Sequence, residues 1–310
     1  MLTSPRFLHE LHGLRFWRTP DFFPPRPDRK QLETLETIVI GTKNRTLGDA
    51  LILSSLPARL TKAYPQLHIR AFVRGHSPWV FLNNPAIDGL SRAPRTLYGD
   101  DCNWGEGHLI QQKERWFHLE PSITVKPEIF LSDTELRTAR AEFETQGPSA
   151  KPIVVLHAAG GTHQGGGLSH EQWNRLCTVL QPYVRIWQLA QRNDQVKIPA
   201  AERAWIFEAG GLELRRMFAG VSQVQGFIGV DSGPMHVARA FEIPSLILSR
   251  RNDVTADLAR ADREPYFLHG NLPVGFLYRE NTHIESHRFD GEEGYERALQ
   301  WVATLKRNHD

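Results

Sequence analysis

The stretch GFIGVDSGPMHVARAFEIPSLIL, residues 226–248, decides the fold class of this chain. It begins with an apolar run that ends at Val230, and such a short unbroken run is typical of a strand buried on both faces of a sheet. Pro234 stands where the first turn of a helix favours proline, and PSLILS (244–249) indicates a second buried strand. A strand, a helix and a second strand in this order predict a parallel pair joined by a crossover helix.

The turn inside this stretch consists of Asp231, Ser232 and Gly233 and carries the first sign of function. The N–H groups of Ser232 and Gly233 have no helical partner and are expected to point out of the carboxyl edge of the sheet, a geometry that accepts a phosphate or diphosphate. Glycine at position 233 lets the backbone approach a ligand closely. The alternative is an ordinary strand–turn–helix in which Asp231 caps the helix.

The same alternation extends through the C-terminal half of the chain. Apolar runs at residues 152–157, 184–189 and 204–207 indicate strands, and segments with helical spacing lie at 169–181 and 212–221. Repeated strand–helix units predict an open parallel sheet with helices on both faces, which is a Rossmann-like domain.

The N-terminal half repeats the pattern on a smaller scale. TIVIG (37–41), HIRAFV (68–73) and a run near 87–90 indicate strands. Residues 48–64 place their apolar side chains at helical spacing, and a kink is expected at Pro57. This half is therefore also expected to hold a parallel sheet covered by helices.

The break QGPSAKP at residues 146–152 is interpreted as a linker between two domains. The predicted fold class is α/β, with two Rossmann-like domains that face one cleft, residues 37–148 and residues 149–310. Residues 1–36 form an N-terminal extension in which Arg and Lys stand beside Phe and Trp. Two interpretations of this extension stay open: a peripheral contact with a membrane or a partner, and packing across its own domain.

The composition excludes several classes of function. The 310 residues carry 37 Lys plus Arg against 35 Asp plus Glu, a net charge of +2, so the chain as a whole is not an electrostatic nucleic-acid binder. No apolar run approaches the roughly 20 residues that a membrane-spanning helix requires. Cys102 and Cys177 lie far apart without metal-site spacing and suggest a reducing, cytoplasmic setting. His283 and His287 lack an evident third metal ligand.

Several motifs, in the correct order, resemble glycosyltransferase family 9, the ADP-heptose:lipopolysaccharide heptosyltransferases, which have the two-domain GT-B fold. DSGPMHVARA (231–240) resembles the family signature D-[ST]-G-x-x-H-x-A-x-A. TLGDALILSSLPARL (46–60) resembles the family's Gly-Asp pair before a Leu-rich helix. FLNNPAIDGL (81–90) and VLHAAGG (155–161) resemble two further family segments. The similarity covers most of residues 37–250.

The family's catalytic base is the Asp of the Gly-Asp pair, so the resemblance implies this role for Asp49. A carboxylate at a loop-to-helix turn, at the carboxyl edge of the first strand, can take the proton of an acceptor hydroxyl as its oxygen attacks the anomeric carbon. The alternative is that Asp49 only stabilises the helix dipole. Thr46 is expected to position the acceptor. Lys43 and Arg45 either attract an anionic acceptor or are solvated loop charges.

The family binds its nucleoside diphosphate in the C-terminal half, which implies a set of donor-binding residues. Those at the phosphates are Asp231, Ser232, Gly233, Ala159, Gly160, Gly161 and Thr162. Asp194 is expected at the ribose hydroxyls and Leu212 against the base. His236, one helical turn into the helix, either faces the cleft or packs beneath it. The resemblance further implies that the last helix, about residues 293–306, returns to the N-terminal domain.

One departure from the family pattern concerns the charge that offsets the diphosphate. Family members often carry a Lys in the loop after the first strand of the C-terminal domain, but this chain has Gly166 or Gly167 there. His163, Arg250 or Arg251 is expected to replace it, and the two arginines are preferred because they follow a strand that ends at the same sheet edge. The alternatives are phosphates held by backbone N–H groups alone, a different donor, or a weakened enzyme.

Together these observations predict an inverting, metal-independent glycosyltransferase that moves a sugar, heptose in the first place, from a nucleoside diphosphate to an acceptor hydroxyl. No cofactor is expected beyond the co-substrate, ADP-heptose. The acceptor is a glycan such as lipopolysaccharide, a lipid-linked molecule, a protein or a small molecule. The expected location is the cytoplasm, at the inner membrane if residues 1–36 contact it. The alternatives are a nucleotide-sugar epimerase on the same architecture and a catalytically silent nucleotide-sugar-binding protein, which the missing Lys motivates.

Overall fold

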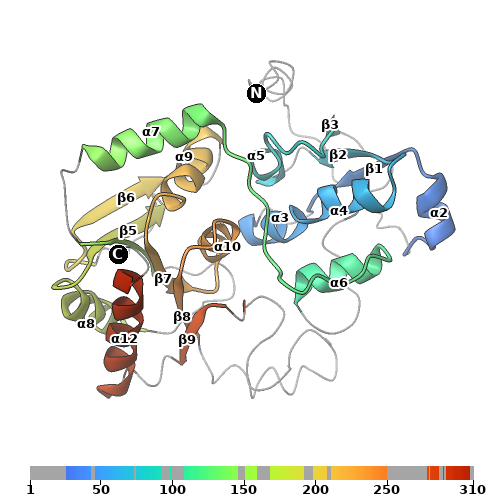
Figure 1. Ribbon diagram of the computed structural model, residues 1–310. Helices are drawn as coiled ribbons and strands as arrows, with labels where there is room; N and C mark the ends of the chain where they lie inside the picture. The colour runs from blue at the N-terminus through green and yellow to red at the C-terminus, as the bar shows by residue number, and fades with distance from the viewer. Residues whose placement is uncertain are drawn as a thin grey trace. The chain divides into compact units, whose positions relative to one another are not determined.

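The computed structural model describes residues 26–42, 46–72, 75–91, 98, 108–145, 151–158, 168–191, 198–207, 211–249, 278, 280–285, 289 and 291–307. The chain divides into two compact units, which we call unit 1 (Met1–Thr134) and unit 2 (Glu135–Asp310). Each unit contains a parallel sheet with helices packed against it (Figure 1). The α/β fold class predicted from the sequence is confirmed.

Within its described residues, unit 1 contains a sheet of three parallel strands in the order β1-β2-β3. The strands are β1 (Thr37–Ile40), β2 (His68–Phe72) and β3 (Gly89–Ser91), and the helices are α2 (Arg29–Thr34), α3 (Leu47–Leu53), α4 (Leu56–Ala63), α5 (Ser77–Val80) and α6 (Leu109–Trp116). Ile40 also forms a parallel bridge with Tyr98, so β1 lies between β2 and Tyr98. The strand order of unit 1 therefore reverses beside β1.

The helix predicted over residues 48–64 is divided into α3 and α4, because the helical hydrogen bonding is interrupted at Ser54 and Ser55. Pro57 lies in the first turn of α4, where the missing N–H of proline removes no helical hydrogen bond. The interruption expected at this proline is therefore confirmed.

Part of the N-terminal extension packs on unit 1. Leu32 of α2 is completely buried in the core of this unit. The guanidinium of Arg26 donates a hydrogen bond of 3.1 Å to the carbonyl oxygen of Trp116, at the end of α6. The described part of the extension, residues 26–36, thus packs across its own domain, which is the second of the two interpretations given above. Residues 1–25 lie outside the described residues.

In the part of unit 2 that the structure describes, six parallel strands form one sheet in the order β6-β5-β4-β7-β8-β9. They are β4 (Ile153–His157), β5 (Arg185–Gln191), β6 (Arg203–Phe207), β7 (Gly226–Val230), β8 (Ser245–Ser249) and β9 (Thr282–Glu285). The chain builds outward from β4 to β6, returns to the other side of β4, and builds outward again from β7 to β9. This is the strand order of a doubly wound Rossmann fold.

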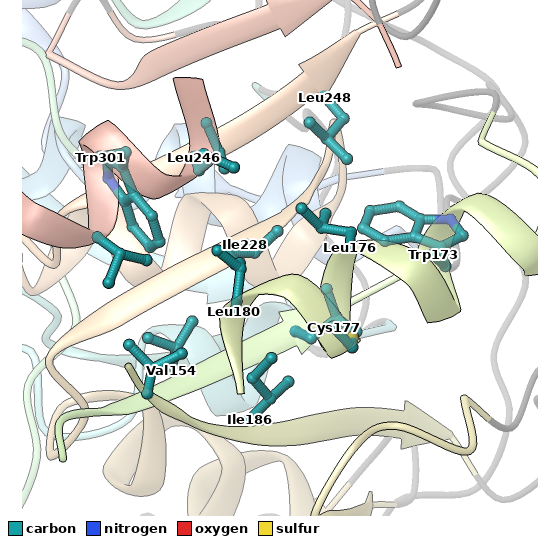
Figure 2. Close-up of a cluster of buried hydrophobic side chains, with 14 of the residues drawn as sticks. Val154, Trp173, Leu176, Cys177, Leu180, Ile186, Ile228, Leu246, Leu248 and Trp301 are labelled. Carbon is teal, nitrogen blue, oxygen red and sulfur yellow. The ribbon is translucent and has the colours of Figure 1, made fainter. Parts of the chain in front are cut away.

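One face of this sheet is covered by α8 (His170–Leu180) and α12 (Glu293–Arg307). Figure 2 shows the core between them, where side chains of both helices meet alternate residues of the strands. The labelled members of this core are Val154, Trp173, Leu176, Cys177, Leu180, Ile186, Ile228, Leu246, Leu248 and Trp301. Alternate strand residues belong to this cluster because successive side chains of a strand point to opposite faces.

The helix that ends the chain differs from the expectation. Ala298, Trp301 and Leu305 of α12 are buried in the core of unit 2, and α12 contacts α8 and β9. It completes unit 2 rather than returning to the N-terminal domain. The physical reason is its apolar stripe, which covers the part of the sheet face that α8 leaves open.

The opposite face of the unit 2 sheet carries the remaining helices. These are α7 (Asp133–Glu144), α9 (Gly211–Val221) and α10 (Gly233–Ala240). Phe143 of α7 stacks on Trp187 of β5 with ring centroids 4.5 Å apart. Arg215 of α9 is buried and forms an ion pair of 2.7 Å with Glu135 of α7. These contacts hold α7 within unit 2, whereas the sequence-based boundary lies after this helix, at residue 148.

The helix α6 and the strand β9 have no counterpart in the sequence-based prediction. The inner side of α6 carries polar residues, since Gln112 and Glu114 are buried there, and this weakens its apolar spacing. Glu114 accepts hydrogen bonds of 2.6 Å from both the N–H and the hydroxyl of Ser122, which satisfies the buried carboxylate. β9 has only four residues and is recognised by its pairing with β8.

Candidate functional site

Ligands of open α/β sheets bind beyond the carboxyl ends of the strands, where the strand order reverses. In unit 2 this position lies between β4 and β7, which are paired in parallel and end at His157 and Val230. The turn Asp231–Gly233 follows β7 directly and leads into α10. The turn singled out from the sequence therefore lies at the reversal point of the unit 2 sheet.

The backbone of this turn presents hydrogen-bond donors. Ser232 is the N-cap residue of α10 with an extended backbone (φ −165°, ψ 165°), and its side chain does not cap the helix. The carbonyl oxygen of Ser232 accepts from the N–H of Met235 at 3.1 Å and from that of His236 at 3.4 Å. Among the described residues, no backbone acceptor faces the N–H of Ser232 or of Gly233. Two such N–H groups at a helix N-terminus have the geometry that accepts an anion.

The hydroxyl of Ser232 ties the turn to both neighbouring strands. It donates a hydrogen bond of 3.0 Å to the carbonyl oxygen of Val230, and its oxygen lies 3.2 Å from Nδ1 of His157. Because its proton is used on Val230, the hydroxyl accepts from the imidazole in this arrangement. His157 is buried at the end of β4. Sequence reasoning missed His157 as a site residue, although it stands directly before the loop that was assigned to the phosphates.

Gly229 allows β7 to run close to β4 just before the turn. A Cβ atom at this position would lie 2.8 Å from ring atoms of Phe227 and 3.0 Å from the carbonyl oxygen of His157. A side chain at 229 would therefore push the Phe227 ring or separate the two strands at the reversal point. The sequence shows this glycine only as part of an apolar run.

His236 packs beneath the turn. Its side chain is 2 % exposed, and its Nδ1 lies 2.6 Å from the hydroxyl oxygen of Tyr278. Of the two positions that the sequence left open for His236, the structure shows the packed one. Burial raises the pKa of Tyr278 well above its ordinary value; Arg239 opposes this rise, while Asp231 and Glu280 add to it. The Tyr278 hydroxyl therefore keeps its proton at neutral pH.

Leu212 is placed at the start of α9, directly after Gly211, whose φ is +63°. Its side chain is 70 % exposed, which is unusual for a large apolar residue in a helix that otherwise buries Leu214, Met217 and Phe218. An exposed apolar side chain is available for contact with a flat apolar group such as a nucleobase.

In unit 1 the corresponding reversal point lies at the end of β1, and α3 begins beyond it. Asp49 is in the first turn of α3, and the hydroxyl of Thr46, the N-cap residue, donates a hydrogen bond to its carboxylate. Thr46 makes no side-chain hydrogen bond to the helix backbone. The structure thus brings Thr46 and Asp49 together, while Lys43 and Arg45, the other residues predicted on the acceptor side, lie outside the described residues. A position in the first turn also stabilises the helix dipole, so the geometry accommodates both interpretations of Asp49.

His76 is a second titratable residue near this edge of the unit 1 sheet. It stands immediately before α5, in the loop that follows β2, which is the parallel neighbour of β1. Its Nδ1 is buried and has no hydrogen-bond partner among the described residues. Burial lowers the pKa of His76, so its imidazole is neutral at pH 7. Sequence analysis did not select this residue.

The other site residues chosen from the sequence lie outside the described residues. They are Lys43, Arg45, Ala159, Gly160, Gly161, Thr162, His163, Asp194, Arg250 and Arg251. No group of three or more His, Cys, Asp or Glu side chains within the described ranges is arranged to hold a metal ion. None of the described helices combines the length and the apolar character needed to span a membrane.

Comparison with known proteins adds to this geometry. Residues 119–254, which include β4, β7 and the turn Asp231–Gly233, match the family model of glycosyltransferase family 9 (heptosyltransferase). A sequence comparison with curated proteins finds no match.

Solved structures of similar fold cover almost the whole chain. A glycosyltransferase family 9 protein from Veillonella parvula is 14 % identical with a TM-score of 0.65, over 90 % of this chain and 99 % of that one. ADP-heptose lipopolysaccharide heptosyltransferase II of E. coli is 14 % identical with a TM-score of 0.60, over 88 % and 99 %. The iron-containing dodecameric glycosyltransferase TibC of enterotoxigenic E. coli is 15 % identical with a TM-score of 0.55, over 89 % and 76 %.

The doubly wound unit 2 and the solved structures of similar fold define the class: the fold is that of the GT-B glycosyltransferases, and residues 119–254 carry a segment of the glycosyltransferase family 9 type. Within that class, the resemblance to glycosyltransferase family 9, the heptosyltransferases, is confirmed.

Proposed function

We propose that this protein is an inverting glycosyltransferase that moves a sugar from a nucleoside diphosphate donor to an acceptor hydroxyl. The observation that carries this proposal is the turn Asp231–Gly233, which directs two N–H groups at the reversal point of the unit 2 sheet. A leaving diphosphate gains negative charge as its bond to the sugar breaks, and fixed backbone donors stabilise that charge without reorganising. The turn lies within the segment that matches the family model.

ADP-heptose is the proposed co-substrate. Its support comes from relatives of the same fold, since one is an ADP-heptose lipopolysaccharide heptosyltransferase and TibC, at a TM-score of 0.52, has a structure in complex with ADP-D-β-D-heptose. The exposed side chain of Leu212 supports a contact with the nucleobase, and Asp194 is proposed at the ribose hydroxyls. No resident cofactor or metal ion is included in the proposed reaction.

Asp49 is the proposed general base. In the transfer step, the acceptor oxygen forms a bond to the anomeric carbon, while the bond between that carbon and the diphosphate oxygen breaks. The acceptor proton passes to the Asp49 carboxylate, and the electron pair of the broken bond leaves with the nucleoside diphosphate. The hydrogen bond from Thr46 holds one carboxylate oxygen of Asp49 in place and leaves the other for the acceptor.

The negative charge of the leaving diphosphate requires a positively charged group, because this chain lacks the Lys that family members often carry after the first strand of the C-terminal domain. We propose Arg250 and Arg251 for this role, because they directly follow β8, whose carboxyl end lies beside that of β7. The second candidate for this role is the segment that follows β4 in the sequence. There, residues 159–162 would donate backbone N–H groups and His163 would donate from its imidazole. Lys43 and Arg45 are proposed to attract an anionic acceptor. The acceptor is a glycan, a lipid-linked molecule, a protein or a small molecule.

A donor screen tests the proposal. The purified chain is titrated with ADP-, GDP-, UDP- and dTDP-sugars, and the donor that binds is then incubated with candidate acceptors while release of the nucleoside diphosphate is measured. Binding of ADP-heptose together with acceptor-dependent release of ADP supports the proposal. Binding without release under any acceptor indicates a catalytically silent nucleotide-sugar-binding protein. Conversion of the bound sugar to its epimer without an acceptor indicates an epimerase.

A further inference from the structure

Tyr278 connects the C-terminal part of unit 2 to the helix that carries the candidate diphosphate site. It lies outside residues 119–254, the segment that matches the family model, and it precedes β9 in the chain. Its side chain is completely buried. Its hydroxyl oxygen lies 2.6 Å from Nδ1 of His236 on α10, although the two residues are 42 positions apart in the sequence.

This contact is a hydrogen bond between two buried side chains. Burial raises the pKa of Tyr278 well above its ordinary value, so the hydroxyl is protonated. The direction of the hydrogen bond follows the tautomer of the His236 imidazole. The rings of the two residues meet edge to face, with centroids 5.5 Å apart, so the imidazole is fixed both by a hydrogen bond and by ring packing.

A second contact holds the same segment on α10. Arg239, one turn after His236, is buried and forms an ion pair of 2.8 Å with Glu280. The Arg239 guanidinium also lies over the Tyr278 ring, 5.6 Å from its centroid. Tyr278 and Glu280 are therefore each fixed to one of two successive turns of α10.

His236 transmits this constraint to the turn through its own backbone. The N–H of His236 donates to the carbonyl oxygen of Ser232, as does the N–H of Met235. That carbonyl shares a planar trans peptide unit with the N–H of Gly233, so the two groups point in opposite directions. When the Ser232 carbonyl points into α10, the Gly233 N–H points out of its N-terminus.

We propose that Tyr278 is a positioning residue for the diphosphate site. By fixing His236, it fixes the peptide unit between Ser232 and Gly233 and holds the Gly233 N–H in the direction of the donor phosphates. This inference rests on the proposed function, because it assumes that the turn binds a diphosphate. It adds to that function a buried residue that lies outside the segment matching the family model.

The test compares two substitutions that remove the same group. Tyr278→Phe deletes the hydroxyl that contacts His236 and keeps the ring beside Arg239. Tyr64→Phe is the matched control: Tyr64 is also buried, and its hydroxyl donates a hydrogen bond of 2.9 Å to the carbonyl oxygen of Phe117 in unit 1. Both variants lose one buried hydrogen bond, so both are expected to have a lower Tm.

Calorimetric titrations use ADP and adenosine as probes. In Tyr278→Phe, the Kd for ADP is expected to rise about fivefold, the value of one hydrogen bond, while the Kd for adenosine stays that of the wild type. In Tyr64→Phe, both Kd values are expected to be unchanged. His236→Asn, whose amide replaces Nδ1, is expected to retain tighter ADP binding than His236→Phe.

The binding data distinguish the role of Tyr278 from the proposed function of the turn. A folded Tyr278→Phe variant that binds ADP as tightly as the wild type overturns the positioning role and leaves the proposed function intact. An equal loss of affinity for ADP and adenosine also overturns it, since a general loss of packing would explain that result. A wild-type protein that binds ADP no better than adenosine overturns the diphosphate site itself, and the role of Tyr278 with it.

Discussion

Nδ1 of His157 and the hydroxyl oxygen of Ser232 lie 3.2 Å apart, although 75 positions separate the two residues in the sequence. The contact joins the carboxyl ends of β4 and β7, where the strand order of unit 2 reverses. It holds the turn that carries the donor N–H groups against the strand that leads into the glycine-rich loop. The arrangement of this turn is the basis of the predictions on donor binding.

Ser232→Ala removes the hydroxyl that contacts both His157 and Val230. We expect the free energy of unfolding to fall by about 1–3 kcal/mol, because two partly buried hydrogen bonds are lost, and the affinity for ADP to fall with it. Ser232→Thr keeps the hydroxyl and is expected to retain both properties. Urea unfolding and titration with ADP measure the two effects. Equal ADP affinity in the Ala variant and the wild type would contradict the role of this hydroxyl.

Asp49→Asn removes the proposed base and keeps the size of the side chain. We expect kcat to fall by roughly 10²–10⁴-fold, the usual contribution of a general base, with little change in donor affinity, since Asp49 lies in unit 1. Asp28→Asn is the control, because Asp28 also accepts a hydrogen bond at a helix N-terminus, from the N–H of Gln31 at 2.7 Å. If Asp49→Asn keeps near-wild-type turnover, the carboxylate only stabilises the helix.

Gly229→Ala places a methyl group against the Phe227 ring and the carbonyl oxygen of His157. We expect the free energy of unfolding to fall by about 1–3 kcal/mol, as for other overpacked cores. Gly291→Ala is the matched control, because a Cβ at Gly291 would meet no atom within 4 Å. Chemical denaturation of both variants gives the comparison. Equal free energies of unfolding for the two variants would contradict this prediction, because they would mean that the methyl group at 229 is accommodated without loss of stability.

Arg250→Ala combined with Arg251→Ala tests the replacement of the missing family Lys. A guanidinium is always charged and matches the geometry of phosphate oxygens. We therefore expect ADP to bind at least tenfold more weakly, which corresponds to about 1.4 kcal/mol, while adenosine binds as before. Titration with each probe separates the two contributions. If the double variant binds ADP as tightly as the wild type, the glycine-rich loop at residues 159–167 becomes the phosphate clamp.

Cys177 should make the stability depend on pH in the alkaline range. Burial raises the pKa of its thiol from 9.0 to about 12, so the unfolded chain loses this proton at a lower pH than the folded chain. The folded state then binds more protons, and stability falls as the pH rises between 9.0 and about 12. The slope is about 1.4 kcal/mol for each pH unit.

Denaturation of the wild type and of Cys177→Ala at a series of pH values measures this effect. The stability difference between the two proteins is expected to be constant below pH 9 and to decrease above it. Other groups titrate in the same range, but they are common to both proteins and cancel in the difference. A difference that does not change with pH would show that the thiol is accessible to water.

The periodic elements of this protein could be predicted from the sequence because their signals are local. The apolar runs of β1, β4, β7 and β8 and the apolar stripes of α8 and α9 indicate their type without reference to the rest of the chain. The turn Asp231–Gly233 and the segment around Asp49 were recognised for the same reason, since a turn and a helix start depend on a few neighbouring residues. These elements were sufficient to predict an α/β fold, while the glycosyltransferase function was implied by the resemblance of the motifs to glycosyltransferase family 9.

The partners of these elements were decided only by the tertiary structure. Local spacing contains no information on strand order, and so it could not show that β4 and β7 are neighbours or that His157 contacts Ser232. Three further features depend on chain segments that are far apart in the sequence. They are the packing of α12 in unit 2, the ion pair that holds α7 there, and the contact between Tyr278 and His236. Sequence determines which faces must be buried, but the burial partner is chosen by the packing of the whole domain, because an apolar stripe is satisfied by any complementary apolar surface.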